Sequence, residues 1–501
     1  MFGCKRDITI LIVLQMILGL AFLVSIPRIY VDEAWDSALG YNLAFKGSLS
    51  HPFIEGFGGM DVHFVQNRVV LPLFCAAIFK VTGYSILTSR VGSLMFSLLA
   101  VLSLYAVMRR WFGEKQAFWI CLATIINPWF FEVSRRARPE IYYTALALVF
   151  LWLMLLYLDS GSRRTAFFAG VLAGLSSLTH PNGVIIVFSI SVAVVIWSRD
   201  KSIGRLILWA VIGLLLVILP YIIYVLWAIQ DPRVSFIEQM APSILQKSFL
   251  RSEVVRWKGF LQLPKGAPLA VVMFFSWIFA WHRSSVADKI TATIILLFAL
   301  LLPFTTVNPT ARYLVAVVPF VIALIIRLIW RTVTGSDVIV QKYRKTRFVI
   351  SMCAAVVYLS ICISAVALLF YRFLGADPYK VIDRAALVIE PNSRVYGDPM
   401  FWFGHKHYQY GPWPYIPPNE PVTVREAITR ISKYRFDYAV RTAWGNTIPI
   451  GIQMPPRSMP DFRNNKLGDH LCRIFGTKID EFYDPYYGPI EIYKLDWDSY
   501  P

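Results

Sequence analysis

The chain has 501 residues, of which 57% are apolar and 16% are charged. Soluble globular proteins carry about 25% charged residues, so this composition excludes a soluble protein and indicates that most of the chain lies in lipid. The formal net charge of +18 does not indicate a nucleic-acid partner, because the basic residues gather at the ends of apolar segments, as the positive-inside rule describes.

Apolar segments near the ~20 residues that cross a bilayer recur along the first three quarters of the chain. The sequence predicts eleven transmembrane helices with the N-terminus inside, because every inner loop is then basic. The predicted spans are 8–26, 91–108, 116–131, 141–158, 166–179, 183–197, 205–229, 268–281, 289–306, 311–330 and 348–371. Residues 69–82 are apolar but short, which is typical of an interfacial or re-entrant helix. Counting residues 69–82 as a span would put the basic segments at Arg109 and Lys342 on opposite sides of the membrane. The eleven-span arrangement keeps both on the inner side.

The first outer loop, residues 27–89, contains two adjacent acids, Asp32 and Glu33, just after the first span. From Ala34 to Phe45 the apolar residues recur at helical spacing, which predicts a juxtamembrane helix along the membrane surface. Carboxyl groups at a membrane interface lose hydration, which suits a general base. The alternative is that the two interfacial acids merely end a helix.

A short outer loop between the third and fourth spans, EVSRRARPE, breaks the positive-inside rule. It places Arg135, Arg136 and Arg138 outside, together with Glu132 and Glu140. Because guanidinium groups bind phosphate bidentately, we expect these arginines to meet an anion. Snorkelling of the arginines to lipid head groups is the alternative.

Two further outer turns carry polar groups. His180 and Asn182 lie in LTHPNG, and Arg312 and Tyr313 lie in NPTARY. A second long outer loop, residues 230–266, is rich in Lys and Arg and is predicted to fold over a site as a lid. The sequence contains no P-loop, GxSxG, HExxH or dinucleotide fingerprint in a credible context.

The composition changes after the last span, which separates a transmembrane catalytic domain, residues 1–371, from a soluble extracytoplasmic α/β domain, residues 372–501. The runs SRVYG, FDYAVRT and IEIYKL predict strands, and VREAITRISKY predicts a helix. The segment FWFGHKHYQYGPWPYIPP suits stacking against sugars or lipid head groups. It equally suits packing of this domain against the membrane domain.

The chain resembles the GT-C superfamily of membrane glycosyltransferases, and within it glycosyltransferase family 39, which includes protein O-mannosyltransferases and aminoarabinose transferases. The resemblance covers about residues 8–330 and rests on the order of five segments. These are VDEAWDSALGYNLAFKG, NRVVLPLFCAAIFKVTGYSILTSRVGSLMFSLLAVLSLYAVMRRWFGEKQAF, SRRARPE, LTHPNG and ARYLVAVVPF. Three places depart from the family pattern. Glu140 stands where Asp is usual, Arg68 lies where a Lys/His-Pro-Pro motif is usual, and His180 stands where Lys or Arg is frequent.

The resemblance implies an inverting glycosyltransferase that moves a single sugar from a polyprenyl-phosphate donor to a lipid, protein or glycan acceptor at the outer membrane face. It assigns the general base to Asp32, with Glu33 beside it and Glu140 at the second acidic position. Candidate ligands of the donor phosphate are Arg68, Arg138, His180, Arg312 and Tyr313.

Polyprenyl phosphate is a fair leaving group, so the chemistry requires positive charge on the departing oxygens and one base, but no general acid. The sequence does not demand a metal ion, although Glu33, Glu140 and His180 leave room for Mg or Mn beside the phosphate. We expect an integral protein of the bacterial inner (plasma) membrane with its site on the periplasmic or extracellular side.

Two alternatives to this function stay open. One is a polytopic lipid or solute transporter or flippase, but such proteins place ionisable residues near the bilayer midplane, and the predicted spans are apolar at their centres. The other is a transferase of the O-antigen-ligase kind, which uses a diphosphate-linked donor.

Overall fold

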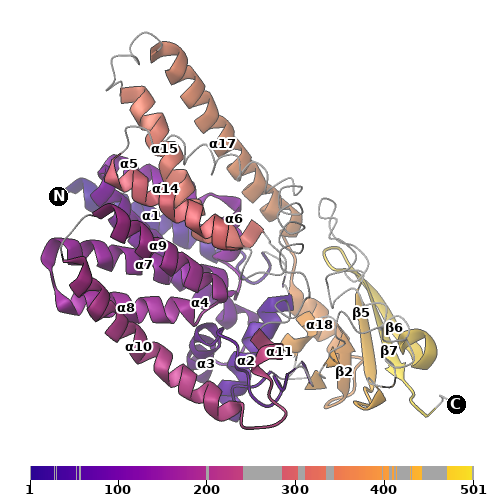
Figure 1. The fold of residues 1–501 in the computed structure, drawn as a ribbon. Helices are drawn as coiled ribbons and strands as arrows, with labels where there is room; N and C mark the ends of the chain where they lie inside the picture. The colour runs from indigo at the N-terminus through magenta and orange to yellow at the C-terminus, as the bar shows by residue number, and fades with distance from the viewer. Residues whose placement is uncertain are drawn as a thin grey trace.

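The structure of the chain is a computed structural model. It describes residues 2–26, 29, 31–51, 54–55, 58–198, 202–240, 285–302, 311–334, 344–397, 399–404, 409–410, 413–414, 429, 432–442 and 471–498. The described helices form a bundle, and a small sheet lies beyond one end of it, on the side away from the N-terminus (Figure 1).

The helices of the bundle follow the chain in this order: α1 Phe2–Leu20, α4 Ile86–Phe112, α5 Glu114–Ile125, α6 Pro128–Val133, α7 Pro139–Ser160, α8 Arg163–Ser177, α9 Pro181–Ser198, α10 Ile203–Ala228, α14 Val286–Leu301, η2 Ala311–Ala316, α15 Val318–Thr334 and α17 Arg344–Phe373. Ten of the eleven predicted spans overlap these helices, and the predicted span 268–281 lies outside the described residues. The predicted span 116–131 is divided, because Asn127 caps α6 and Pro128 follows as its first residue.

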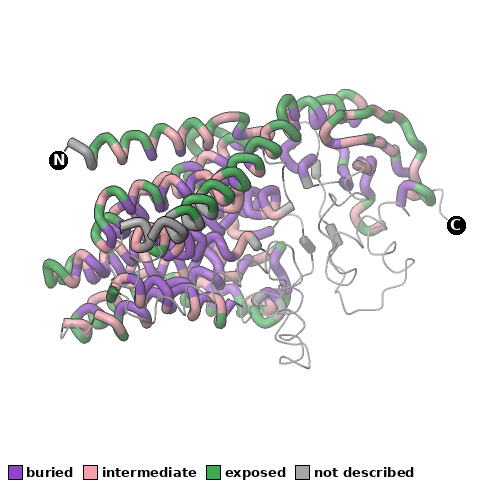
Figure 2. The backbone as a smooth tube through the Cα atoms, turned by 90° about the horizontal axis from the view of Figure 1, so that it is seen from above, coloured by how far each residue is buried: buried purple, intermediate pink, exposed green. Residues whose placement is uncertain are grey.

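Among the described residues, five segments are long and apolar enough to cross a membrane. They are α4, α7, α9, α10 and a segment that begins at Val356 in α17. In the most apolar 18 residues of α7, 72% are buried, whereas in those of α10 only 11% are buried. Figure 2 shows the buried residues gathered inside the bundle and exposed residues along its outer helices. An apolar helix with an exposed apolar face fits a lipid environment, and the chain is an integral membrane protein.

Close packing of α8 on α10 depends on glycines from both helices. A Cβ atom at Gly170 would collide with the main chain at Ala210, and one at Gly213 would collide with the main chain at Phe167. Small residues let helix backbones approach in this way inside membranes. The pairing holds α10 against the bundle although most of its surface is exposed.

Two helices of the first outer loop lie between the bundle and the sheet (Figure 1): α2 Val31–Lys46 and α3 Val70–Thr82. They pack against each other, so the predicted surface helix and the predicted short helix are both confirmed as helices. The start of the second outer loop, α11 Phe236–Met240, is tied to the first. Its buried Gln239 accepts from the Val65 N–H at 2.9 Å. The rest of that predicted lid, from residue 241, lies outside the described residues.

The C-terminal region forms a five-stranded sheet in the order β3-β2-β5-β7-β6. Its strands are β2 Arg394–Gly397, β3 Gln409–Tyr410, β5 Tyr438–Thr442, β6 Gly476–Asp484 and β7 Gly488–Leu495, and α18 Pro378–Ala386 precedes them. β2 pairs in parallel with β3 and β5, whereas β7 pairs antiparallel with β5 and β6. The three predicted strand segments are confirmed as β2, β5 and β7. The predicted helix at 424–434 lies mostly outside the described residues.

The C-terminal region touches α2 through a short 3-10 helix, η3 Pro399–Gly404. The Trp402 ring lies 5.6 Å from Tyr41 of α2, and Phe403 stacks on Tyr84 at 5.4 Å with nearly parallel planes. Both η3 side chains are buried. For these residues, packing against the membrane domain is therefore the correct interpretation of the aromatic segment.

Candidate active site

The first two turns of α2 carry three acids with different surroundings. Asp32 and Asp36 are four residues apart, so they lie on one face of the helix, while Glu33 faces another side. The side chain of Asp32 is 31% exposed, compared with 2% for Glu33 and 1% for Asp36. Asp32 is therefore the acid of α2 that a second substrate reaches most easily.

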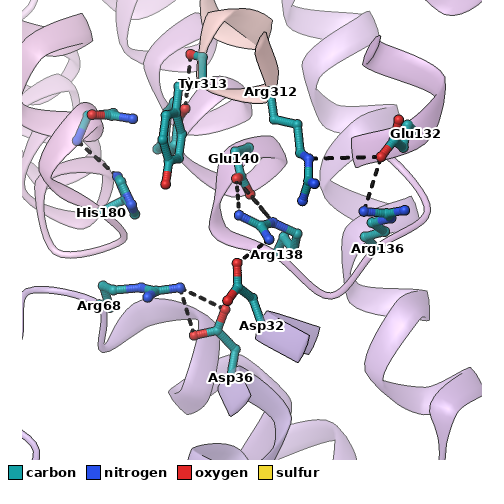
Figure 3. Close-up of polar contacts among 12 residues, drawn as sticks. Asp32, Asp36, Arg68, Glu132, Arg136, Arg138, Glu140, His180, Arg312 and Tyr313 are labelled. Atoms are coloured by element: carbon teal, nitrogen blue, oxygen red, sulfur yellow. Dashed lines mark hydrogen bonds and ion pairs between the residues drawn. The ribbon is translucent and has the colours of Figure 1, made fainter. Parts of the chain in front are cut away.

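Arg138 joins Asp32 to the start of α7. It occupies the N-cap position in an extended conformation, and Pro139 fixes the first helical residue after it. Its Nε lies 3.1 and 3.0 Å from the two Glu140 oxygens, and its Nη1 pairs with Asp32 (Figure 3). Glu140 is fully buried, so the arginine neutralises it and orients the Asp32 carboxylate.

Arg68 forms the second ion pair of the site. Its Nη2 lies 2.9 and 3.1 Å from the two Asp36 oxygens. The next residue, Val69, donates its N–H to the Leu178 carbonyl at 2.9 Å, which fixes Arg68 beside the turn between α8 and α9. The Arg68 Nε is buried without a hydrogen-bond partner among the described residues. Arg68 therefore keeps donor capacity that Asp36 does not use.

Burial raises the pKa of Asp36 to about 7, and the neighbouring Arg68 opposes this shift. The Asp32 carboxylate adds to it, because two nearby negative charges repel. Asp36 is consequently a carboxylate that exchanges a proton near neutral pH.

His180 lies in the turn before α9, and its ring centroid is 5.8 Å from that of Tyr143 and 5.5 Å from that of Tyr313. Its Nδ1 accepts the Asn182 N–H at 3.1 Å, so the neutral ring carries its proton on Nε2. Burial lowers the pKa of His180 to about 3, and Arg68 adds to the effect. The histidine is therefore a neutral Nε2–H donor at physiological pH, in the part of the site shown at the left of Figure 3.

A neighbouring cluster, which we call the Glu132 group, contains Glu132, Arg136 and Arg312. Glu132 lies 3.1 Å from Arg136 and 4.0 Å from Arg312. Figure 3 shows this group beside Arg138, on the side away from His180. The structure thus places Arg312 in a separate ion-pair group, whereas Tyr313, the next residue, lies against His180.

Two of the predicted residues have partners outside this cluster. Glu33 receives a bidentate pair from Arg90 of α4, with both distances 2.9 Å and both side chains almost fully buried. Arg135, expected to meet an anion, donates instead to three main-chain carbonyls at the end of α1 and stacks on Phe131. Arg90 therefore holds α2 against α4, and Arg135 holds the end of α1 and the segment after it against the loop before α7.

The predicted metal ligands do not converge in this structure. Glu33 is occupied by Arg90 and Glu140 by Arg138. Across the described ranges, no group of three His, Cys, Asp or Glu side chains is arranged to hold a metal ion.

The site also contains residues that the sequence did not single out. Asp36 precedes its partner Arg68 by 32 residues, and no local pattern reports such a pair. Arg90 gives a clearer signal, because an arginine at the start of a long apolar segment is costly unless it has a partner. Arg90 is completely buried, which identifies it as a structural ion-pair residue.

In sequence, residues 68–224 match the family model of dolichyl-phosphate-mannose-protein mannosyltransferase. The matched segment contains Arg68, Arg138, Glu140 and His180, whereas Asp32 precedes it. No curated protein sequence matches the chain significantly.

In structure, the chain is similar to ArnT from Cupriavidus metallidurans bound to undecaprenyl phosphate. The TM-score is 0.59 at 13% identity, and the match covers 97% of both chains. It is also similar to the oligosaccharyltransferase of Archaeoglobus fulgidus tethered to an acceptor peptide. There the TM-score is 0.52 at 12% identity, covering 99% of this chain and 74% of the other. The expected GT-C fold is confirmed over nearly the whole chain.

Proposed function

We propose that this chain, which has the GT-C fold, is an inverting glycosyltransferase. It moves one sugar from a polyprenyl-phosphate donor to an acceptor at the outer face of a bacterial inner membrane. The observation that supports this most is the position of Asp32. This accessible carboxylate pairs with Arg138 and lies near enough to Arg68 and Tyr313 to act on both. His180 lies beside Tyr313 in the same cluster.

The donor phosphate is proposed to bind between Arg68, His180 and Tyr313. Arg68 has an unused buried Nε, His180 presents Nε2–H, and Tyr313 adds a phenol hydroxyl. Hydrogen bonds from charged donors to phosphate are shorter and stronger than neutral ones. Arg138 and Arg312 already hold carboxylates, so we expect them to add positive charge near the phosphate.

Charge balance sets a condition on donor binding. The site and the Glu132 group contain four arginines, Arg68, Arg136, Arg138 and Arg312, and four carboxylates, Asp32, Asp36, Glu132 and Glu140. Their formal sum is zero while His180 is neutral. An arriving phosphate therefore meets no excess positive charge and must compete with the carboxylates for the arginines.

The transfer is a single displacement. The acceptor hydroxyl gives its proton to Asp32 as its oxygen forms a bond with the anomeric carbon. The bond from that carbon to the phosphate oxygen breaks, and its electron pair leaves with polyprenyl phosphate. Attack from the face opposite the leaving group inverts the anomeric configuration, and a base in this position contributes ~10²–10⁴-fold in rate.

The relatives support the donor class. The family model that matches residues 68–224 is described by a dolichyl-phosphate-mannose donor, and the ArnT structure holds undecaprenyl phosphate. The related oligosaccharyltransferase structure contains an acceptor peptide. The proposed acceptor is a lipid, protein or glycan.

The function is tested by transfer of labelled sugar from polyprenyl-phosphate-linked mannose or aminoarabinose, with purified protein in liposomes and membrane extract as the acceptor pool. We expect wild-type transfer, and a loss of ~10²–10⁴-fold in Asp32→Asn, with polyprenyl phosphate still bound. Asp61→Asn removes an exposed acid of the same outer loop and serves as the matched control.

Residual transfer above about a tenth of wild type in Asp32→Asn, less than removal of a general base causes, would exclude Asp32 as the base. Movement of the intact lipid-linked sugar across the membrane without transfer would establish the transporter instead. Activity only with diphosphate-linked donors would indicate the ligase type.

A further inference from the structure

Arg68 has two acids within reach. Asp32 and Asp36 lie one turn apart on α2, and like charges at this spacing repel. Figure 3 shows the Arg68 guanidinium pointing to this pair of carboxylates. Burial lowers the pKa of Arg68, but Asp36 and then Asp32 raise it, with a net increase. Both acids therefore act on one guanidinium.

Burial and existing contacts decide which acid holds the arginine. Asp36 is 1% exposed and takes both hydrogen bonds from the Arg68 Nη2. Asp32 is 31% exposed and pairs with Arg138. Without the charge of Asp36, the remaining carboxylate of α2 that acts on Arg68 is Asp32. A carboxylate bound by two arginines is a weaker base than one bound by a single arginine.

We propose that Asp36 is a positioning residue, which holds Arg68 at the donor-phosphate position and keeps it from pairing with the catalytic base Asp32. This inference rests on the proposed sugar transfer and deepens it. It explains why a buried acid is placed one helical turn from the base.

The other groups that act on Asp36 are few. Besides Arg68 and Asp32, Arg138 and Glu140 act on it from the start of α7. Asp36 in turn acts on the Cys75 thiol of α3 and the Tyr142 phenol of α7. Thiol and phenol are neutral near pH 7, so Arg68 is the cation that Asp36 holds directly.

The variant Asp36→Asn removes the charge while keeping the size of the side chain. We expect kcat to fall by roughly threefold to tenfold, and the acid limb of the pH–rate profile to move about one pH unit lower, as an added opposite charge near a carboxyl causes. Loss of the Asp36 charge also lowers the limb directly, because the two carboxylates repel, and this part of the shift does not need Arg68. The shift from Arg68→Gln to Asp36→Asn/Arg68→Gln should therefore be clearly smaller than the shift from wild type to Asp36→Asn. If Asp36 does not position Arg68, the two shifts should be equal.

Asp36→Glu keeps the charge and provides a second test should Asp36→Asn not fold. The acid limb of its pH–rate profile is expected at the wild-type position. A shift in Asp36→Glu, an unmoved limb in Asp36→Asn, or a shift of undiminished size after removal of Arg68 would each overturn the inference.

A density map of the Asp36→Asn protein tests the position of Arg68 and does not depend on an activity measurement. We expect the Arg68 guanidinium within about 4 Å of Asp32, an ordinary ion-pair distance. If Arg68 stays beside the substituted side chain or turns to solvent, the inference fails. Absence of transfer by the wild-type protein would count against the proposed function, while the map would still decide the position of Arg68.

Discussion

Neighbouring acids on one helix have different roles because their partners differ. Glu33 faces the bundle and is held by Arg90, Asp36 faces Arg68, and Asp32 keeps an exposed edge beside Arg138. The identity of a carboxylate therefore does not decide its role here. Burial and the nearest arginine do.

Glu33→Gln should destabilise the protein rather than remove a catalytic group. The change leaves the completely buried Arg90 without its carboxylate, and breaking a buried ion pair in this way costs about 3–5 kcal/mol. The measurement is the thermal stability of detergent-solubilised protein, with Asp32→Asn as the comparison. A Glu33→Gln protein that melts like wild type but lacks transfer would restore a catalytic role for Glu33.

His180 should make the protein sensitive to acid. Its folded pKa of about 3 lies below the ordinary value of 6.5, so the unfolded chain binds the proton first. Stability is then lost as the pH falls from 6.5 towards 3. In His180→Asn, which retains an acceptor for the Asn182 N–H, the drop in melting temperature between about pH 7.5 and pH 5 should be smaller. Equal drops in the two proteins would show that His180 is not held neutral.

At the residue scale, the sequence predicted the polar groups that share one side of the bundle but not their pairing. Asp32, Glu140, Arg138 and His180 were found because each lies in a short segment next to an apolar span. The pair of Asp36 with Arg68 depends on how α2 packs against α3, which local spacing does not report.

At the scale of elements, α2 connects the membrane domain and the C-terminal sheet. Its first two turns carry the acids, and further along Tyr41 contacts Trp402 of η3. Tyr84, just before α4, touches both Trp402 and Phe403. The C-terminal region therefore supports the helix that presents the proposed base.

Trp402→Ala should weaken this contact. Removing a buried aromatic side chain typically costs about 3–5 kcal/mol, so we expect a lower melting temperature and, because α2 loosens, a lower rate of transfer. Tyr483→Ala on β6, where the side chain is 72% exposed, is the matched control. Unchanged melting of Trp402→Ala would mean that η3 does not stabilise the membrane domain.

Three strands were predictable because their apolar residues alternate with polar ones, as in β7, where Ile490 and Ile492 are buried. β6 was not predicted. It lies at the edge of the sheet, and its residues Gly476–Asp484 are exposed or half-buried on both faces. An edge strand of this kind carries no clear apolar period.

At the scale of the whole molecule, hydropathy located most of the helices because lipid imposes long apolar segments. It did not show that Pro128 divides one of them, or that α7 is central while α10 and α17 lie outside. Those properties depend on packing between helices, which glycines such as Gly170 permit.

The central claim is that the polar cluster between α2, α7 and α9 binds a polyprenyl phosphate beside a base. A density map of the purified protein with a polyprenyl phosphate tests it most directly. We predict phosphate oxygens at hydrogen-bond distance, about 3 Å, from Arg68 and from His180 or Tyr313, and about one sugar's width from Asp32. A lipid phosphate bound elsewhere, with Asp32 facing a continuous path across the membrane, would contradict the account.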